Sequence, residues 1–374
     1  MIKGKSTKVL ITGAHGFIGR NLVVALRENH HFDVMSFGRG ESDEKLYRQL
    51  SEADIVIHLA GENRPKSQDY FEITNVGLTK KIAENLKSLG KKTAIIFASS
   101  VQVNLDNPYG KSKLSAEKIL RSLSKLNGNP VTIFRLPGVF GKWCKPNYNS
   151  VVATFCHNIA NGREVRIDDP NHIVRIAYID DVIDLFKESL GEAKSGFHCK
   201  EVGSFYEISL SDLAAQIEAF EKSRGSQISE SVGLGLVRAL YATYVSYLPE
   251  RKFSYEIPSH SDDRGVFVEM LKTPSCGQFS YFTAHPGITR GGHYHHTKTE
   301  KFLVLSGEAK FRFRHLISNE VVVIFTTGNV PKIVDTIPGW AHDITNIGKD
   351  DMIVMLWANE IFDISNPDTI ASKV

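Results

Sequence analysis

The stretch that decides the fold is Val9-Leu10-Ile11-Thr12-Gly13-Ala14-His15-Gly16-Phe17-Ile18-Gly19. It opens with a short apolar run, which predicts a buried strand. Three glycines follow at a spacing of three residues, and the apolar side chains after them recur at helical spacing. A strand, a glycine turn and a helix in this order predict a dinucleotide site. The helix N-terminus offers N–H groups and the positive end of its dipole to phosphates.

Length and composition narrow the class of protein. The chain has 374 residues, of which 42% are apolar and 23% charged, as expected for a soluble globular protein of two domains. A net charge of +3 without a clustered basic run argues against a nucleic-acid partner. Four scattered cysteines without a C-x-x-C pair favour free thiols in a reducing compartment.

No targeting or membrane segment is expected. The first strand begins within ten residues of the start, and the apolar segment Val232 to Leu248 is interrupted by Arg238 and is short for a bilayer. We therefore expect a cytoplasmic protein with no membrane partner.

The pattern of elements changes once along the chain. Up to residue 248, apolar strands alternate with helices, which predicts a Rossmann-like, doubly wound parallel sheet. From Phe253 on, short β-rich runs alternate with turns and no long helix appears, which predicts an all-β barrel or jelly roll. With the boundary near Pro249, the predicted domains are residues 1–248 and 249–374.

The end of the second strand bears on the cofactor. The strand Phe32 to Phe37 is followed by Gly38-Arg39-Gly40. An acidic residue here would hold the ribose 2′-hydroxyl of NAD, whereas an arginine accommodates the 2′-phosphate of NADP. Arg39 therefore favours NADP, with Glu41 or Asp43 as alternative ribose ligands. His58 lies inside the apolar run 54–61 and is interpreted as a core histidine.

A first set of reactive groups follows the fourth strand. Tyr109 and Lys113 are four residues apart on a predicted helix and share one face, and Ser100 ends a strand. A lysine ammonium beside the phenol is expected to lower the tyrosine pKa. The three groups predict acid–base catalysis of carbonyl–alcohol interconversion, with hydride from a nicotinamide.

These residues, together with Asn75-Val76-x-x-Thr79 and Arg135-x-x-Gly138-Val139-x-Gly141, resemble an extended short-chain dehydrogenase/reductase of the nucleotide-sugar branch. The resemblance implies that Asn75 binds substrate and that Arg175 touches the substrate diphosphate. Ser100 and Tyr109 are only nine residues apart, closer than is usual in this family, so Ser99 is the alternative hydroxyl. The cofactor-binding set implied is Gly13, Gly16, Phe17, Ile18, Gly19, Arg39, Leu59, Ala60 and Lys113.

A second set of reactive groups lies in the β-rich part. His293 and His295 are two apart on a predicted strand, so they can grip one ion. Glu300 from the adjoining strand and His342 from a distant one complete a set of three histidines and one carboxylate. The two motifs resemble those of a cupin. Such ligands suit Zn, Fe, Mn or Ni; we expect one divalent metal and favour zinc.

The segment His260 to Glu269 is similar to the first strands of deoxysugar 3,5-epimerases, which are also cupins. In those enzymes the catalytic histidine follows an Arg-Gly pair, as His293 follows Arg290-Gly291-Gly292, and no metal is needed. His293 is therefore either a base or a ligand. The additional presence of His295, Glu300 and His342 favours the ligand role.

A reductase of this branch followed by an epimerase-like cupin resembles the bifunctional capsular polysaccharide enzymes of the CapF/WbjC type, over Val9 to Ala358. The resemblance implies C3-epimerisation of a UDP-2-acetamido-2,6-dideoxy-4-hexulose in the cupin, then NADPH reduction at C4, in a homodimer. The product is UDP-2-acetamido-2,6-dideoxy-L-talose, on the route to N-acetyl-L-fucosamine. Two alternatives stay open, a single-function UDP-4-keto-sugar reductase with a structural or binding cupin and a sugar-sensing binding protein.

Overall fold

The computed structural model describes residues 6–65, 67, 69–191, 195–203 and 205–374. The chain forms two compact units. Unit 1 comprises Met1–Ile217 and Ala239–Leu248, and unit 2 comprises Glu218–Arg238 and Pro249–Val374. The assignment of reductase and epimerase activities to residues 1–248 and 249–374 stays a prediction.

Unit 1 is built on a six-stranded parallel sheet in the order β2-β1-β3-β4-β5-β8. The side chains of Val9, Leu10 and Ile11 in β1 are fully buried, as are Val56 and Ile57 in β3. The predicted Rossmann-like parallel sheet is confirmed. The strands are β1 (Thr7–Thr12), β2 (Phe32–Phe37), β3 (Ile55–His58), β4 (Ala94–Ser100), β5 (Val131–Leu136) and β8 (Phe197–Glu201).

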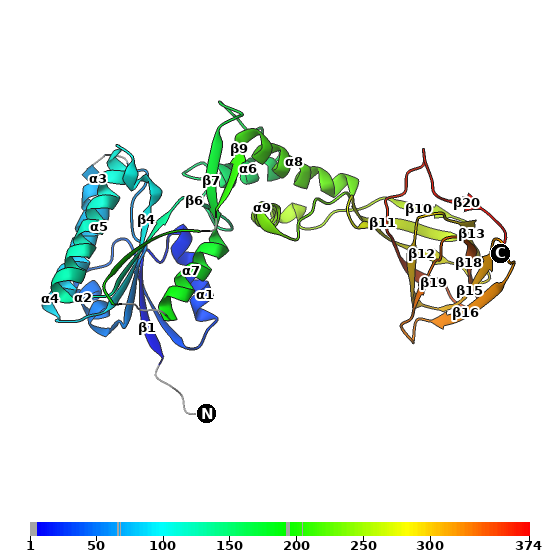
Figure 1. Ribbon diagram of the computed structural model, residues 1–374, viewed down its shortest axis with the longest axis horizontal. Coiled ribbons are helices and arrows are strands. Elements are labelled where there is room, and N and C mark those ends of the chain that lie inside the picture. The colour runs from blue at the N-terminus through cyan, green and yellow to red at the C-terminus, as the bar shows by residue number, and fades with distance from the viewer. Residues whose placement is uncertain (1–5, 66, 68, 192–194, 204) are drawn as a thin grey trace. The chain divides into compact units, whose positions relative to one another are not determined.

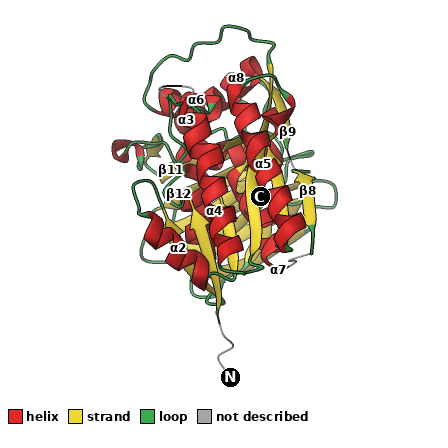
Figure 2. Ribbon diagram, turned by 90° about the vertical axis from the view of Figure 1, so that its left-hand side faces the viewer, coloured by secondary structure: helices red, strands yellow, loops and turns green. Residues whose placement is uncertain are grey.

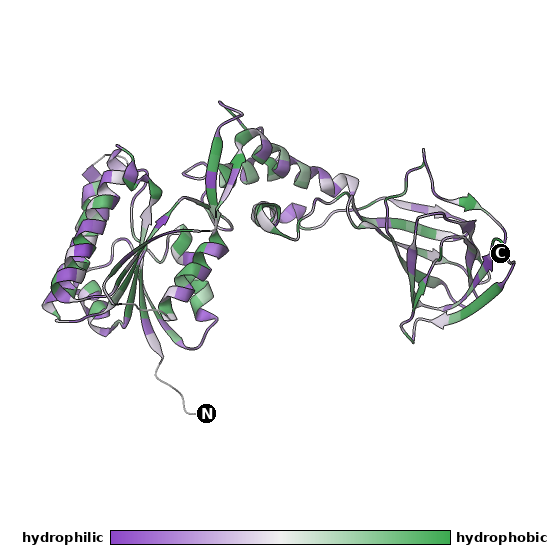
Figure 3. Ribbon diagram, viewed as in Figure 1, coloured by the Kyte–Doolittle hydropathy of each residue, from purple (hydrophilic) through white to green (hydrophobic). Residues whose placement is uncertain are grey.

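Helices cover both faces of this sheet. On one face α1 (Phe17–Arg27) packs against α7 (Ile179–Gly191), and Figure 2 shows α4 (Leu78–Ser88) and α5 (Pro108–Asn127) side by side over the other. Helix α2 (Asp43–Glu52) packs against α4. In Figure 3 the helices of unit 1 carry both hydrophilic and hydrophobic residues, as helices with one buried face do.

Helix α5, which carries Tyr109, has a capping residue at each end. The Asn107 side chain accepts a hydrogen bond from the Gly110 N–H at 2.7 Å, and Pro108 stands at the first helical position. At the other end Gly128 adopts a left-handed conformation with φ 77°. A short helix α3 (Asp69–Phe71), a π-helical turn η1 (Glu72–Gly77) and a 3-10 turn η2 (Val101–Asn104) precede α4 and α5.

A smaller three-stranded sheet completes the strands of unit 1, in the order β6-β7-β9. Its strands are β6 (Gly138–Phe140), β7 (Ile173–Tyr178) and β9 (Tyr206–Ser209), and helix α6 (Val151–Ala160) also belongs to unit 1. Helices α8 (Leu210–Ser226) and α9 (Gly235–Val245) each include residues of both units, and the 3-10 turn η3 (Glu250–Lys252) belongs to unit 2. Asp180 and Asp181 lie within the first turn of α7, because the helix begins at Ile179. Within the described ranges, no helix has the length and apolar character needed to cross a membrane.

Unit 2 consists of antiparallel sheets around one apolar core (Figure 1). Buried side chains from both sheets, among them Phe282, Phe302, Phe311 and Ile344, pack together in this core. The all-β prediction is confirmed. The first sheet has the order β10-β11-β12-β19-β14-β17 and the second β16-β15-β18-β13-β20. Bounds are β10 (Ser259–Asp262), β11 (Gly265–Thr273), β12 (Gly277–Ala284), β13 (Thr289–Tyr294), β14 (Glu300–Ser306), β15 (Glu308–His315), β16 (Val321–Thr327), β17 (Ile333–Asp335), β18 (Trp340–Asn346), β19 (Met352–Ala358) and β20 (Ile370–Ala371).

Candidate functional site

The glycine loop between β1 and α1 has no room for side chains at two positions. A Cβ on Gly13, whose φ is +71°, would lie 2.7 Å from the Ala60 nitrogen, and one on Gly19 would lie 2.2 Å from the Gly13 oxygen. The first turn of α1 has no acidic residue, and no described side chain caps it. The loop therefore leaves backbone N–H groups at a positive helix end, which is an arrangement that binds phosphates.

The candidate ribose ligands have different partners. Arg39 is 85% exposed and its Nη2 lies 2.7 Å from Glu62 Oε2. The Glu41 carboxylate accepts the Gly38 N–H at 2.7 Å and pairs with a lysine of α2. Asp43 pairs with Lys81 at 2.7 Å. Both acidic alternatives are thus bound to lysines, while Arg39 exposes most of its side chain.

The residues at the end of β3 and just after it lie beside the glycine loop. Leu59 donates its N–H to the Thr12 carbonyl at 3.1 Å, and Ala60 follows it beside Gly13. His58 is fully buried, with its ring nitrogens 2.7 Å from Thr12 Oγ1 and 2.9 Å from Thr79 Oγ1. Burial lowers the pKa of His58 to about 3, so the ring is neutral. The interpretation of His58 as a core histidine is confirmed.

Tyr109 and Lys113 do not interact as the sequence predicts. Burial raises the pKa of Tyr109, and its hydrogen bond with Ser100 opposes that rise. The Lys113 ammonium donates to the Ala98 carbonyl at 2.7 Å instead of lying against the phenol. Burial lowers the pKa of Lys113 to about 8, against the attraction of Glu117. The expected lowering of the Tyr109 pKa is therefore not found. Burial raises that pKa, and the Lys113 ammonium is hydrogen-bonded to a backbone carbonyl.

The two serines at the end of β4 point to different partners. Ser99 donates to Glu117 Oε1 at 2.6 Å, and the same carboxylate forms an ion pair with Arg135 at 2.8 Å. Ser100 is hydrogen-bonded to Tyr109. Adjacent strand residues face opposite sides, so only one of the pair lies beside the phenol. This geometry favours Ser100 over Ser99 as the hydroxyl that assists Tyr109.

The two predicted substrate ligands of unit 1 contact other protein groups. Asn75 is buried; its Oδ1 accepts the Glu62 N–H at 2.7 Å, and its Nδ2 donates to the Glu62 carbonyl at 3.0 Å and to Ser112 Oγ at 2.8 Å. Arg175 is exposed on β7, where its Nε lies 3.1 Å from Glu207. Asn75 therefore fixes the chain after β3, and the substrate roles of both residues stay predictions.

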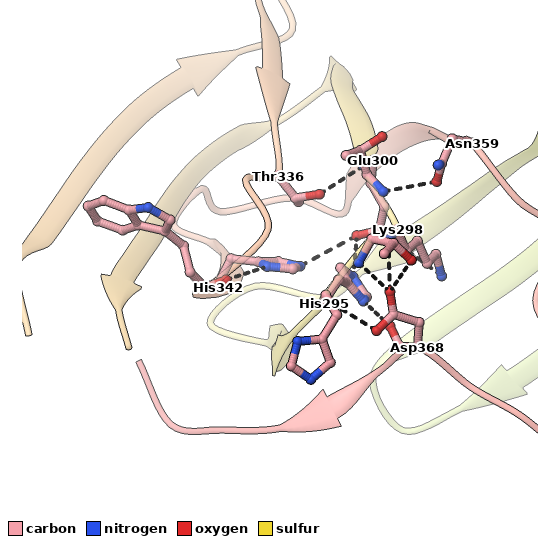
Figure 4. A network of polar contacts seen from close by, with 11 residues as sticks. His295, Lys298, Glu300, Thr336, His342, Asn359 and Asp368 are labelled. Atoms are coloured by element: carbon pink, nitrogen blue, oxygen red, sulfur yellow. Dashed lines mark hydrogen bonds and ion pairs between the residues drawn. The ribbon is translucent and has the colours of Figure 1, made fainter. Parts of the chain in front are cut away.

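In unit 2 the four predicted ligands converge. One ligand atom from each of His293, His295, Glu300 and His342 lies within 4.8 Å of all the others. Glu300 Oε2 is 3.3 Å from His295 Nε2 and 3.4 Å from His342 Nε2 (Figure 4). Burial would raise the pKa of Glu300, but the hydrogen bond with His295, the neighbouring His342 imidazole and the nearby Lys298 charge hold it well below its ordinary value. Burial, with His342 next, lowers the pKa of His293 to about 4.

The way these ligands are brought together differs from the strand argument. The register of β13 shifts between Gly291 and His293, and His295 lies one residue beyond the end of the strand. Glu300 begins β14, which belongs to the opposite sheet and does not pair with β13. His293 and His295 lie side by side, with ring centroids 5.0 Å apart, as the alternation predicts, whereas Glu300 comes from the opposite sheet and not from a strand beside β13.

Sequence reasoning missed the groups that orient the histidines. The Nδ1–H of His295 donates to the Asp368 carbonyl, and His342 Nδ1 lies 3.4 Å from the Trp340 carbonyl. Because these contacts use Nδ1, the Nε2 of each ring faces the cluster. Histidines that bind a metal are commonly held in this way, by a hydrogen bond to the other ring nitrogen. Lys298 Nζ lies 3.5 Å from Glu300 Oε1, and Thr336 accepts the Glu300 N–H at 2.8 Å. No spacing in the sequence marks Asp368, which is some seventy residues away.

Comparisons with known proteins match both units. A model of the NAD dependent epimerase/dehydratase family matches residues 9–208, and one of the polysaccharide biosynthesis C-terminal domain matches residues 260–370. A UDP-2-acetamido-2,6-beta-L-arabino-hexul-4-ose reductase from Pseudomonas aeruginosa is 51% identical over 367 residues, 98% of this chain and 99% of the relative. A crystal structure of the capsular polysaccharide assembling protein CapF from Staphylococcus aureus is 40% identical, with a TM-score of 0.91 over 98% of this chain and 100% of that one.

The chain belongs to the NAD dependent epimerase/dehydratase family, within the CapF/WbjC type of capsule enzyme. As a CapF/WbjC-type protein it is a nucleotide-sugar enzyme of the reductase and epimerase class, and its family implies a nicotinamide cofactor. The UDP-glucuronic acid 4-epimerase of Bacillus cereus, solved with NAD, is 21% identical with a TM-score of 0.56 over 64% of this chain and 98% of that one; that likeness concerns the fold alone.

Proposed function

We propose that this enzyme is bifunctional. Unit 2 inverts C3 of a UDP-2-acetamido-2,6-dideoxy-4-hexulose, and unit 1 then reduces C4 with NADPH to give UDP-2-acetamido-2,6-dideoxy-L-talose for capsular polysaccharide synthesis. One observation carries the proposal: each unit holds a separate set of reactive groups, hydrogen-bonded hydroxyls in one and a buried histidine–carboxylate cluster in the other. The 4-ketose named for the Pseudomonas aeruginosa relative supports the substrate class.

The reduction uses the groups at the end of β4 and the start of α5. Gly13, Gly16 and Gly19 would hold NADPH, which when bound would supply hydride for C4. The Tyr109 hydroxyl gives its proton to the oxygen at C4, and its raised pKa keeps it protonated at neutral pH, as an acid must be. Ser100, hydrogen-bonded to the phenol, holds the same oxygen. Lys113 is expected to orient the cofactor with the N–H donors that its bond to the Ala98 carbonyl leaves available.

The epimerisation depends on the same ketone. A carbonyl at C4 makes the hydrogen on C3 acidic, so a base can remove it and the carbon can be reprotonated on the opposite face through an enolate. Enolisation needs only the ketone, a base and a group that stabilises the oxygen anion. The Nη2 of Arg290 is buried without a hydrogen-bond partner among the described residues, and it is a donor suited to that oxygen.

The residues of the cluster fit a divalent metal. Buried His342 Nε2 has no well-formed hydrogen bond within the described chain, and three imidazoles with one carboxylate form a donor set that metals of the zinc type accept. His293, His295, Glu300 and His342 would hold one such ion, with zinc favoured. Bound there, a metal supplies positive charge for an anionic oxygen or a structural crosslink. His293 as the base is the alternative assignment.

A second candidate function is a ketoreductase with a structural or binding cupin. The Pseudomonas aeruginosa relative, which is named as a reductase, favours it. We propose a homodimer for either function, by resemblance to the family.

One experiment separates the two functions. The 4-keto sugar is incubated with the enzyme in heavy water and followed by NMR, first without and then with NADPH. Bifunctional catalysis predicts that C3–H exchanges for deuterium before any cofactor is added and that reduction follows NADPH. Exchange that appears only together with reduction would instead establish the ketoreductase with a structural cupin.

A further inference from the structure

An ion pair lies at the carboxyl end of β1 in unit 1. Arg39 follows β2 and Glu62 follows β3, and these strands flank β1 on its two sides. The side chains meet at 2.7 Å between Arg39 Nη2 and Glu62 Oε2. In a parallel sheet the carboxyl ends of all strands lie at one edge. The pair therefore spans the end of β1, where the glycine loop begins.

The two partners are held unequally. Glu62 is 14% exposed and is anchored at three points: its N–H donates to Asn75 Oδ1, its carbonyl accepts from Asn75 Nδ2, and its Oε1 accepts the Tyr148 hydroxyl at 2.9 Å. Arg39 is 85% exposed, and its one described side-chain bond is the one to Glu62. When a competing anion arrives, Arg39 can change partner, whereas Glu62 stays in place.

The relative strengths of the two interactions that Arg39 can make favour such an exchange. The Arg39 side of this pair is open to solvent, and solvent screening weakens an ion pair. A guanidinium binds a phosphate through two parallel charge-assisted hydrogen bonds, which are stronger. A 2′-phosphate at Arg39 would draw it from Glu62 and would then lie beside a carboxylate that cannot move away. A 2′-hydroxyl would make no such demand on Arg39.

We propose that Glu62 sets the cofactor preference of unit 1, because its carboxylate competes with the 2′-phosphate of NADPH for Arg39. Glu62 thereby weakens NADPH binding below what Arg39 alone would give, and it leaves NADH binding unchanged. The inference rests on the proposed role of Arg39 as the 2′-phosphate ligand.

The test measures the Kd of NADPH, NADH and 2′,5′-ADP for full-length wild type and Glu62→Gln by calorimetry. Glutamine keeps the shape and can still accept the Tyr148 hydroxyl, but it lacks the charge. We expect NADPH and 2′,5′-ADP to bind about threefold to tenfold more tightly, and NADH to change by less than about twofold. Glu52→Gln is the matched control, because that carboxylate pairs with Lys8 at 3.0 Å before β3; it should change no Kd.

The double variant identifies the route of the effect. In an Arg39→Ala background, Glu62→Gln should no longer strengthen NADPH binding. Equal changes for NADPH and NADH, or a selective loss of NADH, would overturn the inference, the latter because Glu62 would then hold the ribose hydroxyl. If Arg39→Ala weakens NADPH selectively but Glu62→Gln has no effect, the inference fails and the proposed function stands. If Arg39→Ala leaves the NADPH-to-NADH ratio unchanged, the NADPH role of Arg39 fails together with the inference.

Discussion

The charged groups of unit 1 and the ligands of unit 2 are arranged in opposite ways. In unit 1, Lys113 is bound to the Ala98 carbonyl, Arg39 to Glu62 and Arg175 to Glu207. In unit 2, four ligand atoms converge within 4.8 Å, and contacts with Asp368 and Trp340 orient two of the rings. The groups of the first set are each paired with a different protein group, whereas those of the second converge on one point.

The contrast has consequences for both units. Groups that exchange partners can be tuned by changing the partner, as Glu62→Gln is expected to do for Arg39. The metal affinity of a convergent cluster depends on its ligands and on the groups that hydrogen-bond to those ligands, because all the ligands must bind the same ion. Substitutions in one unit should therefore leave the other unit's chemistry intact, and the following predictions test that separation.

The largest expected effect is that of Tyr109→Phe. It removes the proton donor for the C4 oxygen, so NADPH-dependent reduction should fall by about a hundredfold to ten-thousandfold. Exchange of the C3 proton should continue at the wild-type rate, since unit 2 is untouched. NADPH oxidation and deuterium exchange measure the two steps.

Tyr47→Phe serves as the matched control, because this half-exposed tyrosine of α2 lies outside the site and should leave both steps unchanged. Reduction within about threefold of wild type in Tyr109→Phe would contradict the acid role of Tyr109.

The next effect concerns the cluster. His342→Ala removes one of the four converging ligands, and we expect metal binding to weaken by more than about a hundredfold, because changes even in the outer shell cost ten- to hundredfold. C3 exchange should fall with metal content, while reduction of an already epimerised 4-keto sugar should stay at wild-type level. Titration against a competing chelator gives the affinity.

The control is His285→Ala, an exposed histidine of unit 2 that pairs with Asp351 at 2.8 Å. A His342→Ala protein that retains one tightly bound metal would contradict the ligand assignment. A wild-type protein that is metal-free, folded and active in both steps would favour His293 as a metal-independent base.

The sequence predicts the fold more completely than the partners of the reactive groups. Apolar runs such as Val9 to Ile11 mark buried parallel strands, whereas β8 was missed because Phe197–Glu201 is a half-exposed edge strand with polar residues. Residue types and spacing were enough to select the four converging ligands. They could not show that Glu300 comes from the opposite sheet, because the pairing of strands is a tertiary property.

The same limit applies to charges. A lysine four residues after a tyrosine on a helix predicts contact, but the Lys113 ammonium reaches the Ala98 carbonyl on β4. Burial then raises the pKa of Tyr109 where proximity to a cation would lower it. Periodicity locates the face of a helix; the burial and the competing acceptors on that face depend on strands that are distant in sequence.

Lys113→Met tests how strongly the lysine charge is buried. The pKa of Lys113 is lowered by burial from 10.5 to about 8. Between these values the unfolded chain binds more protons than the folded one, so wild-type stability rises with pH there. Methionine does not titrate. The free energy of unfolding of the variant minus that of wild type should therefore fall by about 2 kcal/mol between pH 7 and pH 9.5.

Urea unfolding of the full-length proteins measures this difference, and the transition that added NADPH shifts identifies unit 1. The change with pH isolates the titration, because the lost hydrogen bond to Ala98 costs the variant the same at every pH. Parallel curves for the two proteins would contradict a lowered pKa of Lys113.

The smallest expected effect is that of Asp368→Asn, which leaves all four ligands in place. The Asp368 carboxylate accepts the N–H groups of His296, Thr297 and Lys298 at 2.7–2.9 Å and the Thr297 hydroxyl at 3.0 Å. Burial would raise the pKa of Asp368, but these donors hold it well below its ordinary value. Its carbonyl also receives the His295 Nδ1–H.

Asparagine keeps one acceptor oxygen and replaces the other with an NH2 group, which faces N–H donors and leaves at least one unpaired. The segment from His295 to Lys298 should loosen, and metal affinity should weaken by about tenfold, the low end for an outer-shell change. Asp363→Asn is the matched control, because that exposed carboxylate accepts hydrogen bonds from Ser365 and Asn366, which follow it closely in the chain. Unchanged affinity in Asp368→Asn would mean that β13, β14 and β18 position the ligands without help from the Asp368 carboxylate.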